Sequence, residues 1–178
     1  MQELERTLFN GVCVMNDFPI VKEYNSEYLE EVIELILHIQ QQEYNVAITQ
    51  GDQPDLFNIE EYYQTGNGNF WIAFHGKRVV GTISLLDIGE QQVALRKMFV
   101  HEDFRGATFK TASLLLDTAI NWANEHSINA VFLGTTPQFL AAHRFYEKNG
   151  FITISRKDLP ENFPVLQVDK KFYKYMIN

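Results

Sequence analysis

The sequence predicts a single α/β domain in which helices flank a mixed β-sheet. Alternating apolar runs within residues 70–100 indicate an antiparallel meander, and a strand, helix and strand within residues 93–134 indicate a parallel crossover. Amphipathic segments on either side of this region supply the packing helices. The chain has 178 residues, 46% of them hydrophobic, which is enough for one buried core. No linker, repeat or low-complexity segment divides it, so residues 1–178 are expected to fold together.

The first elements expected are a strand over residues 19–24 and a helix after it. Ser26 is a suitable residue to cap that helix. The apolar residues that follow recur at steps of three and four, which predicts one buried face: Leu29, Val32, Ile33, Ile36 and Leu37. A shorter acidic helix is predicted over residues 55–64.

The centre of the chain is predicted as three strands over residues 70–74, 78–86 and 93–100. Gly76 and Lys77 form the first turn between them, and residues 87–92 form the second. Short turns between apolar runs favour antiparallel neighbours.

A helix of about four turns follows over residues 109–123, and a short buried strand over residues 130–134. A connection of this length, made by a helix, brings the two flanking strands into parallel pairing. The sheet is therefore mixed.

The last helix has a signal at each end. Thr136 is expected to cap it with Pro137 at its first position, and Asn149-Gly150 to end it. Strands over residues 151–155 and 172–177, separated by a Pro-rich turn, complete the sheet.

Charge and cysteine content narrow the functional class. With 23 acidic and 15 basic residues the net charge is -8, which repels nucleic acid and anionic membranes. It favours cationic amine substrates, although acidic composition also serves ordinary solubility. Cys13, the only cysteine, is expected to be a buried apolar side chain in a reducing, cytoplasmic compartment. No run spans a bilayer, residues 1–10 lack a signal-peptide core, and no residue cluster has metal-ligand spacing.

Residues 98–112 carry the most informative pattern, a strand that runs through a short loop into a helix. Arg105 and Lys110 lie at this helix start, and no acidic residue follows before Asp117. Cations at a helix start cost about 0.3–1 kcal/mol unless an anion is bound there. The pattern thus indicates a phosphate site, or else solvated cations at an ordinary helix start.

This segment resembles the GCN5-related N-acetyltransferase (GNAT) family. The hallmark of that family is a strand ending in Val, about four residues, and Arg-x-x-Gly-x-Gly/Ala at a helix start; Val100 and Arg105-Gly106 keep the spacing. A second signature is similar too, with Ala142 before the run from Phe145 to Phe151. The resemblance covers residues 69–151. It implies that residues 1–178 are one N-acetyltransferase domain with a splayed mixed sheet and acetyl-CoA as cosubstrate.

The resemblance also implies how acetyl-CoA would be held. The backbone of Met98, Phe99 and Val100 would bind the pantetheine arm. Thr108 and Lys110 stand where the family most often has glycine, and Lys110 either adds charge for the phosphates or weakens binding. The pyrophosphate would lie on the amides of Arg105, Gly106, Ala107, Thr108, Phe109, Lys110 and Thr111.

Tyr146 is the position that the family most often uses to protonate the departing thiolate, and a phenol suits that role. Without the resemblance, Tyr146 would be taken for a core aromatic. A strand N–H near Phe99 would polarise the thioester carbonyl. His143, one turn earlier, either contacts the adenosine end or is an exposed helix residue.

The general base stays unassigned. The strand over residues 93–100 has no Glu, and its only charged residues are Arg96 and Lys97. Deprotonation of the amine is left to ordered water or to a carboxylate elsewhere. Asp55, Glu60 and Glu61 are candidates because their helix could border the acceptor cleft, but a charged, solvated helix face is the favoured interpretation of them.

The functional expectation is an enzyme in which a primary amine attacks acetyl-CoA directly. The alternative is a non-catalytic acyl-CoA binding or sensing module of the same fold. A generic nucleotide-binding domain is disfavoured, because no Gly-x-Gly-x-x-Gly or Gly-Lys-Ser/Thr loop follows a strand. The acceptor is expected to be a small-molecule or peptide amine, with no nucleic acid, membrane or metal partner; a homodimer is possible, as in the family.

Overall fold

The computed structural model of the protein describes residues 8–9, 12–13 and 18–178, with side chains from residue 18 onward. Strands β1 (Leu8–Phe9) and β2 (Val12–Cys13) pair with each other. The expectation that the Cys13 side chain is buried lies outside the described side chains.

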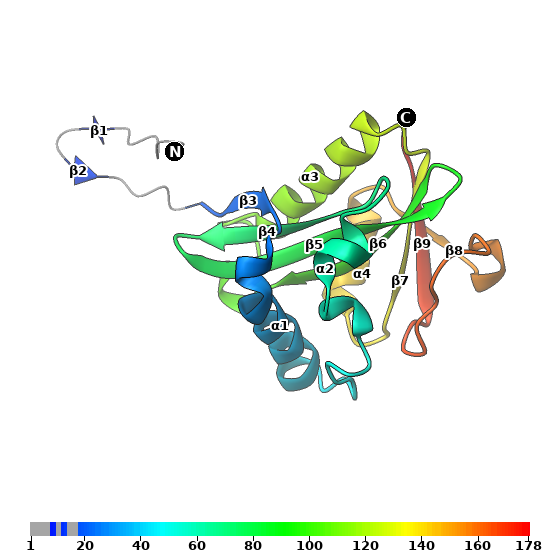
Figure 1. Cartoon of the computed structure of the whole chain (residues 1–178), viewed down its shortest axis with the longest axis horizontal. Helices are drawn as coiled ribbons and strands as arrows, with labels where there is room; N and C mark the ends of the chain where they lie inside the picture. Colours follow the sequence, from blue (N-terminus) through cyan, green and yellow to red (C-terminus); the bar gives the residue numbers. More distant parts are fainter. Residues whose placement is uncertain (1–7, 10–11, 14–17) are drawn as a thin grey trace.

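A mixed sheet runs through the molecule from β3 to β9 (Figure 1). In the part of the chain that is described, its seven strands have the spatial order β3-β4-β5-β6-β7-β9-β8. The pairs are antiparallel except β6 with β7, which is the predicted parallel crossover. The bounds are β3 Ile20–Glu23, β4 Asn69–His75, β5 Arg78–Gly89, β6 Gln92–Val100, β7 Ala130–Thr135, β8 Ile152–Ile154 and β9 Lys171–Met176.

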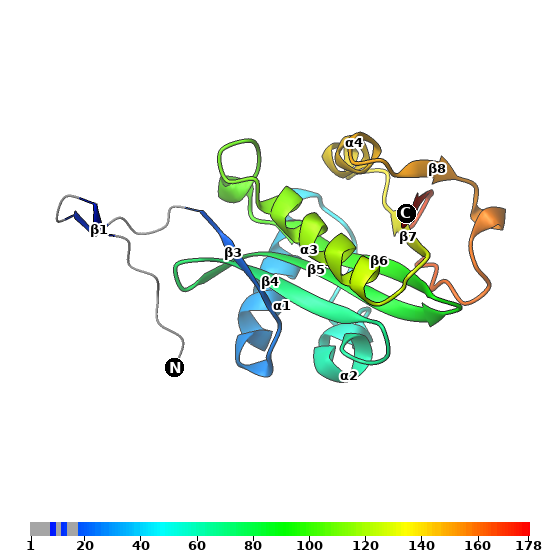
Figure 2. The ribbon, with the colours of Figure 1, turned by 90° about the horizontal axis from the view of Figure 1, so that it is seen from above.

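Helices cover both faces of this sheet (Figure 2). On one face lie α3 (Thr111–Glu125) and α4 (Leu140–Lys148), and on the other α1 (Leu29–Leu37) and α2 (Ile59–Tyr63). We call these the α3/α4 side and the α1/α2 side. Short helical segments connect them: η1 Ser26–Tyr28, the π-helical η2 His38–Glu43, η3 Pro54–Leu56, η4 Glu102–Phe104 and η5 Arg156–Asp158.

The core on the α3/α4 side forms because α3 presents small and aliphatic residues to the sheet. Leu115 and Ala119 are fully buried against β4, β5 and β6. Each fully buried Leu contributes about 1.5–3 kcal/mol. The core also holds Trp71 of β4 and Trp122 of α3, whose rings meet edge to face at 5.6 Å, while His126 stacks on Trp122 at 3.7 Å.

The N-terminal helix differs from its prediction at both ends. Asn25, not Ser26, is the cap, and its side chain accepts a hydrogen bond from the Glu27 N–H at 3.0 Å. After Leu37 the helix continues as η2, which was not predicted. The predicted acidic helix over residues 55–64 is broken into η3 and α2, with Asn58 capping the second piece.

The start of α4 was predicted three residues too early. The helix begins at Leu140, and the Thr136 hydroxyl makes no cap hydrogen bond. Its end is confirmed: Gly150 has a φ of 89°, which favours glycine, and the Phe151 N–H donates to the Tyr146 carbonyl at 3.0 Å. The C-terminal strands β8 and β9 are confirmed as well.

Candidate active site

The site lies where β6 and β7 separate. Only Gln92–Ala94 of β6 pair with β7, through Ala130–Phe132. Beyond this pairing, β6 continues to Val100 and β7 to Thr135 without contacting each other as strands. A cavity of about 330 Å³ occupies the resulting gap. The sheet is therefore splayed, as the resemblance to the GNAT family implied.

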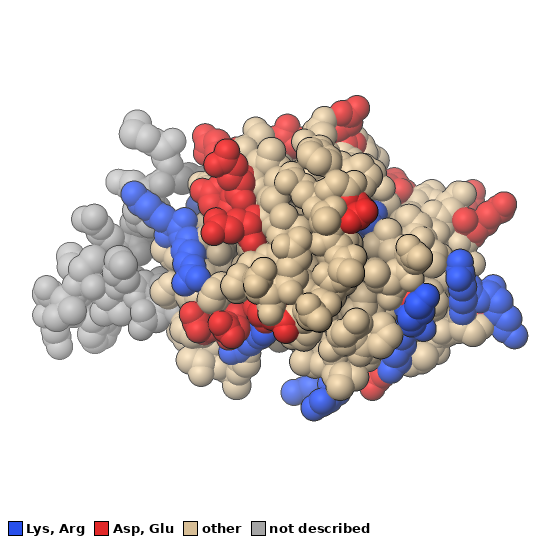
Figure 3. Space-filling model, turned by 90° about the horizontal axis from the view of Figure 1, so that it is seen from below, with Lys and Arg blue, Asp and Glu red and all other residues tan. Residues whose placement is uncertain are grey.

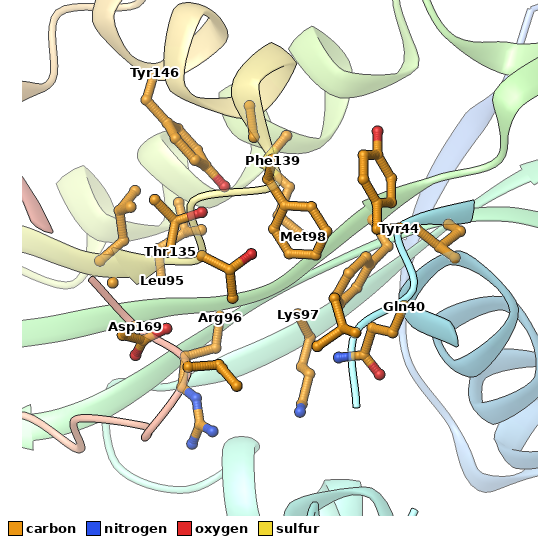
Figure 4. A pocket seen from close by; sticks show the side chains of 18 of the residues that line it. Gln40, Tyr44, Leu95, Arg96, Lys97, Met98, Thr135, Phe139, Tyr146 and Asp169 are labelled. Atoms are coloured by element: carbon orange, nitrogen blue, oxygen red, sulfur yellow. The ribbon is translucent and has the colours of Figure 1, made fainter. Parts of the chain in front are cut away.

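Side chains from the α3/α4 side point into this gap. Ala142, Phe145 and Tyr146 of α4 and Ala112 of α3 line it. In Figure 4, the Tyr146 ring reaches from α4 toward the opening between the strands. The Tyr146 side chain is 5% exposed, and its hydroxyl makes no hydrogen bond with a described residue. The Tyr146 hydroxyl is thus available to a ligand bound in the cavity.

Burial sets the protonation state of this phenol. Removal from water, and to a lesser degree the neighbouring Tyr173, raises the pKa of Tyr146 above its ordinary value of 10. The hydroxyl therefore carries its proton at any physiological pH. It can donate a hydrogen bond or a proton to an anionic atom in the cavity.

The turn before α3 offers a row of unused backbone donors. From Arg105 to Ser113, only the amides of Arg105 and Lys110 donate to a described residue. The others converge on a helix start, where the helix dipole adds positive potential. Gly106, with a φ of 86°, turns the chain into this loop, and no neighbour lies within 4 Å of where its Cβ would be. The loop can accommodate an anionic group.

The structure divides the predicted cofactor residues into two sets. Met98, Phe99, Val100, Arg105 and Gly106 line the cavity. Ala107, Thr108, Phe109, Lys110 and Thr111 do not, and their side chains are not directed at it: the Phe109 ring packs against Phe104, and the Thr111 hydroxyl donates to the Phe104 carbonyl.

The Arg105 side chain is used inside the protein. Its Nε donates to the Val100 carbonyl at 2.7 Å, and its Nη2 pairs with Glu43 of η2, also at 2.7 Å. This pair ties the loop before α3 to the helix on the opposite side of the cavity. The guanidinium therefore holds the loop in place.

Thr136, directly after β7, is a polar residue of the cavity wall that the sequence predicted only as a helix cap. The Thr136 hydroxyl lines the cavity, is buried, and has no hydrogen-bond partner among the described residues. The His143 ring bonds to the Thr136 carbonyl at 2.9 Å and is 8% exposed, so the reading of His143 as an exposed helix residue is wrong. A buried hydroxyl without a partner is costly unless a ligand supplies one.

The α1/α2 side of the cavity is shaped by a bulge in β6. Between the pairs Ser84–Arg96 and Thr82–Phe99, β5 has one residue and β6 has two. Lys97 lies in the bulge with a φ of 51°. The Ser84 and Thr82 hydroxyls donate to the Arg96 and Lys97 carbonyls at 2.9 and 2.6 Å, which satisfies the backbone there.

Lys97 is buried with its counter-charge. Its Nζ lies 3.2 Å from Asp55 and donates to the Gln53 side chain at 2.6 Å. Asp55 also accepts from the Tyr63 hydroxyl. Loss of hydration outweighs the attraction to Asp55, so the pKa of Lys97 falls from 10.5 to about 8. Of the three carboxylates considered from sequence, only Asp55 is brought near the cavity; Glu60 and Glu61 are exposed on α2.

Arg96 and Asp169 face the same side of the sheet. Arg96 follows Ala94 by two residues and Gly134 follows Phe132 by two, and Ala94 and Phe132 share one cluster on the α1/α2 side. The Asp169 carboxylate lies directly against Gly134. Figure 4 shows Arg96 and Lys97 pointing away from Tyr146, with Asp169 across from Arg96.

The remaining wall comes from a segment in which the sequence showed no motif. Gln40 of η2 and Tyr44 after it line the cavity, and Gln40 exchanges hydrogen bonds with Gln53 at 2.9 and 3.1 Å. The π-helical turn of η2 is the local feature that marks this site, since such turns often occur at functional positions. On the surface shown in Figure 3, acidic and basic side chains flank a central region of uncharged residues.

The described residues offer neither a metal centre nor a membrane-spanning helix. No group of three or more His, Cys, Asp or Glu side chains there could hold a metal ion. Within the same residues, no helix has the length and apolar character needed to cross a membrane.

Comparison with known proteins places the chain among acetyltransferases. The model of the Acetyltransferase (GNAT) family matches residues 33–151. A GNAT-family acetyltransferase from Staphylococcus aureus Mu50 is 43% identical, with a TM-score of 0.87 over 90% of this chain and 99% of that one. An acetyltransferase from Streptococcus agalactiae 2603 is 31% identical, with a TM-score of 0.85 over 91% and 99%.

A curated relative shares a shorter region. N-acetylaspartate synthetase of Mus musculus is 36% identical over 106 residues, which are 58% of this chain. The chain spans about a third of that protein, since the match covers 35% of its length.

Proposed function

Because this chain belongs to the acetyltransferase (GNAT) family, we propose that it transfers an acetyl group from acetyl-CoA to a primary amine by direct attack. The observation that carries the proposal is the cavity in the splayed sheet, with the Tyr146 hydroxyl on its wall and unused amides at the α3 start. We propose residues 1–178 as one catalytic domain. A cytoplasmic location is proposed too, supported by the single cysteine.

In this mechanism the pyrophosphate of acetyl-CoA binds at the loop before α3. The amides of Gly106, Ala107, Thr108 and Phe109 donate to it, and Arg105 positions the loop. The dipole of α3, which begins at Thr111 directly after Lys110, adds favourable potential. The pantetheine arm lies along Met98, Phe99 and Val100. The acetyl group is thereby brought into the gap between β6 and β7.

The chemical step is nucleophilic addition followed by loss of the thiolate. The neutral amine nitrogen attacks the thioester carbonyl carbon, and a strand N–H near Phe99 stabilises the charge that develops on the oxygen. The carbon–sulfur bond then breaks and the thiolate takes the Tyr146 proton. The extra proton on the new amide nitrogen passes to water, and the Tyr146 phenolate regains a proton from water. Holding both reactants in one cavity supplies a large part of the rate acceleration.

Calorimetric titration with acetyl-CoA and with CoA tests the binding half of this proposal. Lys110→Glu puts a negative charge at the proposed phosphate site and is expected to weaken both ligands about tenfold or more. Lys157→Glu makes the same charge change on exposed η5, outside the cavity, and is the matched control. Equal affinities in the two variants, or no binding by the wild type, would contradict the assignment.

Thiol release with a panel of amines tests the catalytic half. Tyr146→Phe is expected to lower kcat by about 100-fold, within the range for loss of a general acid, while the acetyl-CoA affinity stays the same. Unchanged turnover in this variant would remove Tyr146 from the mechanism. Tight binding of acetyl-CoA without thiol release for any amine would instead identify a non-catalytic acyl-CoA binding module.

A further inference from the structure

Arg96 differs from the other cations of the cavity wall because it has no ion pair. Lys97 is paired with Asp55 at 3.2 Å, and Arg105 with Glu43 at 2.7 Å. For Arg96, no carboxylate of the described residues lies within salt-bridge distance. Among the described residues, the wall thus carries one cation without an ion-pair partner.

The contacts that Arg96 does make leave its donors available. Its Nη1 lies 3.5 Å from the Tyr62 hydroxyl, and its Cζ lies 6.0 Å from the centre of the Tyr62 ring. These contacts orient the guanidinium on one side and use at most one of its five N–H groups. A planar, partly buried guanidinium with free donors matches a carboxylate, which it binds through two parallel hydrogen bonds.

Asp169 provides the opposite charge on the β7 wall. It is 9% exposed, and its Oδ2 accepts from the Leu166 N–H at 3.1 Å, whereas its Oδ1 makes no hydrogen bond with a described residue. A Cβ on Gly134 would lie 2.6 Å from Oδ2, so only glycine lets the carboxylate take this position. Burial raises the pKa of Asp169, against the opposing effects of Leu166, Arg96, Lys97 and Lys170.

We propose that the acceptor is a small amine of the amino-acid type, with its carboxylate on Arg96 and its amino group at Asp169. This inference rests on the proposed acetyl transfer and specifies its substrate. Asp169 takes one proton from the substrate ammonium: an N–H bond breaks, an O–H bond forms on Oδ1, and the freed lone pair attacks the thioester. The proton leaves Asp169 to water as the product departs.

The experiment compares free amino acids with their primary amides, which keep the amine and side chain but lack the carboxylate charge. Thiol release from acetyl-CoA is measured for each pair. Wild-type protein is expected to prefer the acids by about tenfold or more in kcat/KM, as for loss of a hydrogen bond to a charged group. Arg96→Gln removes that preference by raising KM for the acids alone, and Arg96→Lys restores part of it.

Arg156→Gln is the matched control, because Arg156 is exposed on η5 and does not line the cavity. Acetyl-CoA titration and thermal unfolding of each variant establish that it is folded and binds the donor. Asp169→Asn, which keeps the shape beside Gly134, is expected to lower kcat for acids and amides alike by about 100-fold.

Two results overturn the amino-acid acceptor but leave the proposed acetyl transfer intact. One is that amides are acetylated as well as acids, and the other is that Arg96→Gln lowers the activity toward acids and amides equally. Unchanged kcat in Asp169→Asn removes the assignment of the base. Absence of thiol release with every acid, amide and simple amine contradicts the proposed acetyl transfer itself, so the two failures are distinguishable.

Discussion

Lys110 adopts a backbone conformation that ordinarily belongs to glycine. Its φ is 53° and its ψ is 27°, and it is the residue immediately before α3. A residue with a Cβ in this left-handed region costs about 1–2 kcal/mol. The family's preference for glycine at this position thus has a physical reason here, and the protein accepts the cost in exchange for a cation beside the free amides.

Substitutions of Lys110 are expected to separate the effect of backbone strain on stability from the effect of the lysine charge. Lys110→Gly should raise the free energy of unfolding by up to about 1 kcal/mol relative to Lys110→Ala, because both variants lose the charge and only glycine removes the strain. Urea unfolding at fixed pH measures this difference. Lower stability of the glycine variant would contradict the strain argument.

The sequence identified some residues of the site better than others. Tyr146 and Val100 follow local motifs, so their place on the cavity wall could be predicted. Arg96 and Asp169 carry no local signal, because their meeting depends on the register of β6 and on the course of the segment before β9. Such long-range positions follow from tertiary packing, which a single sequence does not display.

At the scale of elements, the bulge in β6 gives the α1/α2 side of the cavity its character. The extra residue buries Lys97 against Asp55 and leaves Arg96 facing the same side. The side chain of Lys97 is 4% exposed, so its charge has lost nearly all contact with water. The fold therefore has a pH-dependent weak point at this strand.

The stability of the protein is expected to rise with pH through the titration of Lys97. In the unfolded chain the lysine holds its proton up to about pH 10.4, whereas in the folded chain its pKa is about 8. Between these values the unfolded state binds more protons, so the free energy of unfolding increases by roughly 2 kcal/mol from about pH 7 to about pH 9.5.

Urea unfolding of wild type and Lys97→Met at both pH values tests this expectation. Other groups titrate over the same range, so the informative quantity is the difference between the two proteins. That difference should change by roughly 2 kcal/mol, because the free energy of unfolding of the methionine variant increases less at the higher pH. A pH-independent difference would show that Lys97 does not titrate in this range.

The ends of α1 and α4 show where local sequence signals do not suffice to predict the structure. Pro137 indicated a helix start, yet α4 begins at Leu140. The residues before it form a turn, in which the Phe139 N–H donates to the Thr136 carbonyl, and both of these residues line the cavity. Likewise, the apolar period of α1 gave no warning of η2, since a π-helical turn changes the spacing by a single residue. The meander, the crossover and the C-terminal hairpin were predicted because their periodicity and turns are local.

At the scale of the whole molecule, the sheet consists of two parts joined by a narrow connection. Strands β3 to β6 form one part and β7, β9 and β8 the other, and the two parts share only the pairing of Gln92–Ala94 with Ala130–Phe132. The Arg105–Glu43 pair joins the loop after β6 to η2 and so lies within the first part. A ligand in the gap would contact both parts at once.

Acetyl-CoA is therefore expected to stabilise the entire fold. At a free concentration 100 times its Kd, a ligand specific for the folded state adds about 2.7 kcal/mol, which corresponds to a rise in Tm of roughly 5–10 °C for a chain of this size. Thermal unfolding followed by circular dichroism measures the shift. AMP at the same concentration is the control, and an equal shift with AMP would contradict specific binding in the gap.

The edge-to-face contact of Trp71 and Trp122 has a consequence for how such events can be observed. Both indoles belong to the core between β4 and α3, and neither lines the cavity. Intrinsic fluorescence, excited at the indole band, therefore reports the detachment of α3 from the sheet rather than the arrival of a ligand. The emission of these two rings therefore follows unfolding, and we expect its intensity in the folded state to stay the same when a ligand occupies the cavity.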